Sequence, residues 1–122
     1  MVYETRTMEL SKRQQQVASL IQDELAQAIL HEGVVPLGVL ATITEVFVSP
    51  DIEHATVSFS IFPATQEPET MQILQKSIGD FQHNLNRRLH MRFVPQLYFK
   101  IDRGAKKGNE NEEKMGDLLR DR

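Results

Sequence analysis

One short segment in the middle of the chain alternates apolar with hydroxyl-bearing side chains, and this alternation constrains the fold more than any other feature. Its apolar members are Ala55, Val57, Phe59 and Ile61, and Thr56, Ser58 and Ser60 stand between them. Successive side chains of a strand point to opposite faces of a sheet, whereas a helix would scatter these residues around its circumference. The segment therefore predicts a strand with one buried apolar face and one hydroxyl-rich face.

Two further segments predict partner strands. Residues 37–48 are rich in β-branched side chains, and their apolar parity slips near Glu45, which indicates a bulge. The short connection 49–54 favours an antiparallel hairpin with the central strand. After Pro95, the apolar residues Leu97, Phe99 and Ile101 alternate with polar ones and predict a third strand.

Two helices are predicted around these strands. Ser11 and Gln14 match a capping box, and an apolar stripe follows, so the first helix should run from Ser11 to about His31 and stop at Gly33. A second helix should follow Thr65 as its N-cap, with Pro68 tolerated in the first turn. Its apolar stripe is formed by Met71, Leu74, Ile78, Phe81, Leu85 and Leu89.

Gly79 interrupts this second helix. Glycine inside a helix costs about 0.5–1 kcal/mol relative to alanine, so its presence indicates a kink or a close backbone approach. A glycine that is merely tolerated in a packed helix is the alternative. We expect a helix kinked at Gly79.

Length and composition indicate one ordinary globular domain. The 122 residues contain 40% hydrophobic and 25% charged side chains. We expect a flexible N-terminal segment at 1–10, a domain at 11–103 and a mobile charged tail at 104–122. The chain has no cysteine, which excludes disulfides and thiolate metal sites. No segment predicts a signal peptide or a membrane span, so a cytoplasmic location is expected. We also expect a monomer.

Positive charge is concentrated in the second half of the chain. Eight basic and two acidic residues lie between Lys76 and Lys107, a net charge of +6, although the whole chain carries −3. A basic region in an acidic protein is typical of a surface that binds a polyanion, and a solvated helix face is the alternative. The candidate residues for contacting such a polyanion, RNA among them, are Lys76, Ser77, Gly79, His83, Arg87, Arg88, Arg92, Lys106 and Lys107.

Enzyme and metal-site motifs are not apparent. Asp51, Glu53 and His54 form a polar cluster in a turn, and His83 and His90 lie seven residues apart. Neither set has the spacing of a zinc protease, a phosphate-binding loop or a nucleophile elbow. We expect turn capping and solvated imidazoles there, and hence no catalytic residue, metal or cofactor.

Aromatic side chains give a weaker signal. Phe81, Phe93 and Phe99 have the parity of core residues, whereas Tyr98 should point to the exposed face of the third strand. An exposed tyrosine can stack on a nucleobase, but an ordinary surface tyrosine is the alternative.

The order of these motifs resembles the ribosome-binding factor A family. The resemblance is carried by Ser49-Pro50-Asp51 with His54-Ala55, then Ser77-Ile78-Gly79, then Arg88-Leu89 with Arg92, and finally Val94-Pro95, Leu97, Phe99 and Asp102. It covers about residues 13–103. In this family an Ala-x-Gly kink stands where RNA-binding KH domains carry a Gly-x-x-Gly loop. Ser77 departs from that pattern at its first position.

The resemblance implies a fold and a function. The fold would be a single α+β, KH-like domain of type II character, with the order α-β-β-α-β and a three-stranded sheet packed on helices. The function would be that of a non-catalytic assembly factor that binds ribosomal RNA on free small (30S) subunits and precursor particles. Late maturation, processing of the 5′ end of the precursor RNA and cold adaptation are implied with it. A small protein-interaction module whose basic face meets an acidic protein is the alternative; neither a membrane nor a small-molecule substrate is expected.

Overall fold

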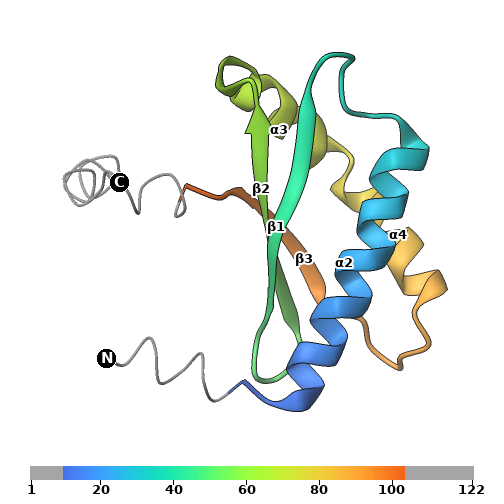
Figure 1. Ribbon diagram of the computed structural model, residues 1–122. Helices are drawn as coiled ribbons and strands as arrows, with labels where there is room; N and C mark the ends of the chain where they lie inside the picture. The colour runs from blue at the N-terminus through green and yellow to red at the C-terminus, as the bar shows by residue number, and fades with distance from the viewer. Residues whose placement is uncertain (1–9, 104–122) are drawn as a thin grey trace, which may run out of the picture.

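The computed structural model describes residues 10–103, in which helices cover one face of a three-stranded sheet (Figure 1). The expected segments 1–10 and 104–122, apart from Leu10, lie outside the described residues. The elements follow one another as α2 (Lys12–Glu32), β1 (Leu40–Val48), β2 (His54–Phe62), the 3-10 turn η1 (Ala64–Gln66), α3 (Glu67–Lys76), α4 (Ile78–Arg88) and β3 (Gln96–Ile101).

The sheet has the order β1-β2-β3, with β2 in the centre. The alternating segment that dominates the sequence is therefore the central strand. β1 pairs antiparallel with β2 from Leu40 opposite Phe62 to Val48 opposite Ala55, as the short connection predicted. β3 pairs parallel with β2, so α3 and α4 form the crossover between them.

The bulge predicted near Glu45 is confirmed. The register of β1 against β2 shifts between Ile43 and Glu45. The hydroxyl of Thr44, the extra residue, lies 2.6 Å from Asp102 Oδ2 and 3.2 Å from the carbonyl of Ser58, and these two acceptors share its single proton. A side chain of the bulge thus connects β1 to the end of β3 across the central strand.

The start of α2 is fixed by the predicted capping box. Ser11 Oγ accepts from the Gln14 N–H at 2.9 Å, and Gln14 Oε1 accepts from the Ser11 N–H at 2.8 Å. The same glutamine is buried and donates through Nε2 to the carbonyl of Val48 at 2.8 Å, so the cap also attaches the helix to β1. Gly33 ends the helix with a φ of 62°, a left-handed conformation that glycine adopts without strain.

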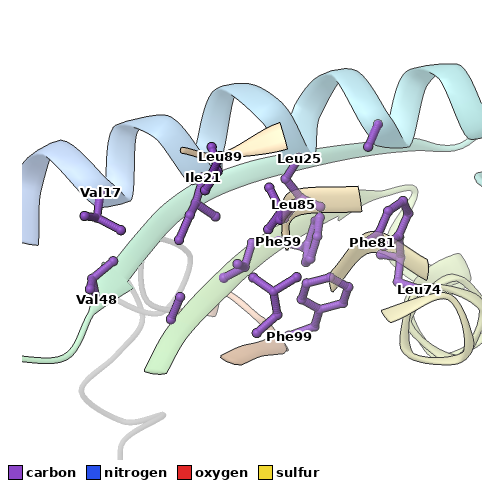
Figure 2. Close-up of a cluster of buried hydrophobic side chains, with 14 of the residues drawn as sticks. Val17, Ile21, Leu25, Val48, Phe59, Leu74, Phe81, Leu85, Leu89 and Phe99 are labelled. Carbon is purple, nitrogen blue, oxygen red and sulfur yellow. The ribbon is translucent and has the colours of Figure 1, made fainter. Parts of the chain in front are cut away.

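The hydrophobic core lies between the helices and the inner face of the sheet (Figure 2). Val17, Ile21 and Leu25 of α2 point toward the strands, and Phe59 and Phe99 meet edge to face with ring centroids 5.2 Å apart. Phe81 of α4 completes this aromatic cluster at 6.1 Å from Phe99. The outer face of the sheet carries the hydroxyl residues of β2 and Tyr98, whose exposed position was predicted correctly.

The second helix is interrupted at Ser77, two residues before Gly79. The Ser77 N–H closes α3 on the carbonyls of Ile73 and Leu74, and the Ser77 carbonyl starts α4 by accepting from Asp80 and Phe81. Gly79 has no positive φ and lies in the first turn of α4. The break therefore follows from a change of hydrogen-bond register at a serine, and the glycine belongs to the surface that the break exposes.

The predicted N-cap of that helix is wrong. Thr65 lies inside η1, and α3 begins at Glu67 after Gln66, which makes no side-chain capping bond. Pro68 does occupy the first turn of α3, where its missing N–H costs no hydrogen bond. The 3-10 turn moves the start of the regular helix past the threonine.

Candidate nucleic-acid interface

The outward side of the α3–α4 unit carries a row of basic and polar side chains. Lys76 ends α3, and His83 and Arg87 follow on successive turns of α4, all of them outside the buried core. The opposite side of α4 is anchored by Phe81 and Leu85, each about 1% exposed. Burial of this apolar stripe fixes the rotation of the helix and hence the direction in which the basic residues point.

The exposed start of α4 adds backbone N–H groups to this surface. The Asp80 and Phe81 N–H groups already bond to the Ser77 carbonyl, but the Ser77 side chain caps neither the Ile78 nor the Gly79 N–H group that precedes them. A Cβ added to Gly79 would meet open space. A phosphate can therefore approach these donors closely, although the Asp80 carboxylate in the same turn opposes a simple anion site.

Arg88 is engaged within the protein. Its Nε donates to Glu24 Oε1 on α2 at 2.7 Å, and its side chain remains 53% exposed. The pair lines a groove between α2 and α4 that also includes His31 and Asn84. Arg88 was predicted as a phosphate contact, and the structure shows that such a contact would compete with Glu24.

Arg92 lies beyond the end of α4, against an aromatic ring. Its guanidinium carbon is 5.5 Å from the ring centroid of Phe93, within the range of a cation–π contact. Phe93 itself is 76% exposed, so its predicted place in the core is wrong. The segment between α4 and β3 is irregular, and strand parity therefore does not apply to it.

The other basic residues of the positive region differ in their surroundings. Lys106 and Lys107 lie outside the described residues. Arg103 forms an ion pair with Glu67 at 3.1 Å. Between residues 10 and 103, the ion pairs engage Arg88 and Arg103 but not Lys76, Arg87 or Arg92. Among the described candidates, Lys76, Arg87 and Arg92 are therefore available, whereas Arg88 is already paired.

The polar cluster in the β1–β2 turn acts as turn capping. Asp51 Oδ1 accepts from Ser49 Oγ at 2.6 Å and from the Glu53 N–H at 3.0 Å, and these bonds lower the pKa of Asp51. Among the residues that the structure describes, no three or more His, Cys, Asp or Glu side chains are placed so that they could hold a metal ion together. In the same region, no helix combines the length and the apolarity needed to cross a membrane.

The sequence profile described as Ribosome-binding factor A matches residues 13–115, most of the chain. The chain belongs to the ribosome-binding factor A family. It is 35% identical over 119 residues to ribosome-binding factor A of Synechococcus sp. (strain CC9311), covering 94% of this chain and 88% of that protein. It is 38% identical over 105 residues to the Prochlorococcus marinus relative, covering 83% and 80%.

Solved structures of ribosome-binding factor A have the same fold. The solution structure of a ribosome binding factor A from Thermotoga maritima matches with a TM-score of 0.63 and 26% identity, covering 75% of this chain and 89% of that one. The crystal structure of the Thermus thermophilus protein matches with a TM-score of 0.62, at 24% identity, over 70% of this chain and 92% of that one. The α+β, KH-like fold with three strands is confirmed.

Sequence reasoning missed two features of this surface. Glu24 and Arg88 are 64 residues apart, and neither the helix periodicity nor the charge count signals their pairing. The exposed ring of Phe93 was missed because its parity imitates that of a core residue. The position of Phe93 between Arg92 and Pro95, outside any regular element, could have indicated that its ring is exposed.

Proposed function

We propose that this protein is a non-catalytic assembly factor that binds ribosomal RNA of the immature small subunit through the α3–α4 surface. The observation that carries the proposal is the combination of available cations with an uncapped, glycine-containing helix start on one unit. Lys76, Arg87 and Arg92 supply charge that attracts the phosphate backbone, and guanidinium groups add a planar fork of donors.

Membership of the family supports the choice of RNA. A further set of coordinates similar to this chain, with a TM-score of 0.56, is described as a homology model of Thermus thermophilus ribosome binding factor A fitted into the cryo-EM map of a 30S complex. By extension, this protein would bind free small subunits and precursor particles in the cytoplasm as a monomer. Preferential binding to one conformation of the RNA would shift its population and so promote late maturation, 5′-end processing and growth in the cold.

Co-sedimentation through a sucrose gradient tests this proposal. The wild-type protein should travel with free small subunits, and a Lys76→Ala/Arg87→Ala/Arg92→Ala variant should remain near the top. A Lys12→Ala/Arg13→Ala variant is the matched control, because it removes two exposed cations from the start of α2 instead. Equal sedimentation of both variants would contradict the assignment of the surface.

Salt dependence provides an independent test. Three side chains that each neutralise a phosphate of single-stranded RNA predict a slope of about −2 for log affinity against log salt concentration. A slope near zero would remove the electrostatic basis of the proposal. Ribosome-independent capture of an acidic protein through the same residues would favour a protein-interaction module instead.

A further inference from the structure

A cavity of about 530 Å³ lies beside the basic surface, between the β1–β2 turn and the segment that enters β3. Figure 1 shows these two segments together at the lower end of the molecule. The lining of the cavity combines apolar with hydrogen-bonding side chains: Asp51, Ile52, Glu53, Phe93, Val94 and Gln96. The volume lies within the range of about 300–1,000 Å³ that is typical of small-ligand sites.

The two walls of this cavity are connected and held in shape. The Gln96 N–H donates to the Glu53 carbonyl at 2.9 Å, which joins the turn to the start of β3. In the turn, Ile52 has a φ of 61°, a conformation that β-branched residues rarely adopt, and its N–H donates to the Ser49 carbonyl at 2.8 Å. Hydrogen bonds from both sides thus keep Asp51 and Glu53 at the rim.

Phe93 gives the cavity an exposed aromatic surface. Its ring is 76% exposed, and the Arg92 guanidinium lies over it. Proteins that bind single-stranded RNA hold unpaired bases against such rings, with an arginine close to the backbone phosphate. A cationic peptide side chain would instead meet Arg92 as a like charge, so the observations favour a base.

The polar groups at the rim of the cavity favour one kind of base over the others. Asp51 Oδ1 already accepts two hydrogen bonds within the turn, so the exposed Glu53 carboxylate is the better placed of the two to accept a pair of donors with both oxygens. A carboxylate pairs with two parallel N–H donors, and the Watson–Crick edge of guanine offers N1–H and N2–H in that arrangement. The amide of Gln96 can donate to the neighbouring O6. Uracil offers a single donor, N3–H, between two carbonyl acceptors, so it cannot form the paired contact and would be disfavoured.

We infer that this cavity receives one unpaired guanine of single-stranded RNA, stacked on Phe93 and paired with Glu53, while Arg92 contacts its phosphate. The inference rests on the RNA binding proposed above and specifies a base at the edge of the same surface. It assigns base recognition to the β1–β2 turn and leaves backbone attraction to the α3–α4 unit.

Fluorescence anisotropy with two labelled RNA decamers tests the inference. One probe is all uridine, and the other carries a single central guanosine. Wild-type protein should bind the guanosine probe about tenfold more tightly, which is the discrimination expected of a bidentate contact. Phe93→Ala should bind the guanosine probe about tenfold more weakly, because the stacking ring is removed, and Phe93→Tyr should keep the wild-type affinity. Glu53→Gln should remove the preference without weakening the uridine probe.

Phe62→Ala is the matched control, because Phe62 is 70% exposed at the opposite end of β2. Equal wild-type affinity for the two probes, or the same small effect from Phe93→Ala and Phe62→Ala, would overturn the guanine site and leave the proposed function standing. A lysine-rich peptide that binds wild type but not Glu53→Gln, with RNA binding unchanged, would show a peptide site instead. Absence of binding to both probes would contradict the proposed function as well.

Discussion

Gln82 joins α4 to the start of β3, and its replacement by methionine should destabilise the domain strongly. Gln82 Nε2 donates to the Pro95 carbonyl at 3.0 Å, and Gln82 Oε1 accepts from the Leu97 N–H at 2.8 Å. Pro95 and Leu97 are both buried, so neither backbone group can readily bond to water after the change. Methionine keeps the length and the helix propensity of glutamine but offers neither bond.

The expected cost follows from these two contacts. A buried donor or acceptor left without a partner costs about 1–3 kcal/mol, and the better packing of methionine offsets a part of two such penalties. We expect a loss of about 3 kcal/mol in the free energy of unfolding. For a domain of this size, that corresponds to a melting temperature lower by about 12–24 °C.

Urea denaturation followed by circular dichroism measures this loss. Gln72→Met is the matched control, since Gln72 is an exposed glutamine of α3, and it should change stability by less than about 0.5 kcal/mol. Both variants should keep the wild-type dependence on urea concentration. A loss below about 1 kcal/mol for Gln82→Met would refute the claim that the side chain fastens α4 to β3.

Three further predictions concern the interface and the turn. Glu24→Gln should release Arg88, tighten RNA binding and steepen the salt slope by about 0.7, whereas Asp23→Asn, which alters an exposed neighbouring carboxylate, should leave the slope unchanged. Gly79→Ala should raise the free energy of unfolding by about 0.4–1 kcal/mol in urea titrations, because the backbone there is helical and the added Cβ meets open space; a loss of stability would contradict that geometry. Asp51 has a lowered pKa, so its stabilising contribution is complete above about pH 4, the ordinary aspartate value, and is lost as the pH falls through the lowered value. Unfolding measured against pH should therefore be less acid-dependent in Asp51→Asn than in the wild type.

The features that the sequence predicts correctly depend on residues close together in the chain. The capping box at Ser11 and Gln14, the left-handed Gly33 and the alternation of β2 each follow from a few neighbouring side chains. The bulge near Glu45 was also predictable, because a parity slip is visible within one strand. Local chemistry determines these elements, and tertiary packing agrees with it.

The features that could not be predicted depend on contacts across the fold. The helix breaks at Ser77 because its N–H and carbonyl serve two different helices, whereas the sequence signal pointed to Gly79. Arg88 is paired because α2 and α4 pack side by side, which places Glu24 within reach. Phe93 is exposed because the chain leaves α4 in an irregular segment. None of these causes is contained in a short window of residues.

The parallel pairing of β3 with β2 means that the interface is completed late when the chain is synthesised. An antiparallel hairpin such as β1–β2 can close as soon as its turn has emerged from the ribosome, but β3 follows the whole α3–α4 crossover. Until residues 96–101 emerge, Gln82 lacks its partners at the start of β3, and α4 packs on α2 without support from that strand. A nascent chain that stops before Gln96 therefore carries Lys76, Arg87 and Arg92 before β3 supports α4, and under the proposed function we expect selective binding only after β3 has joined the sheet.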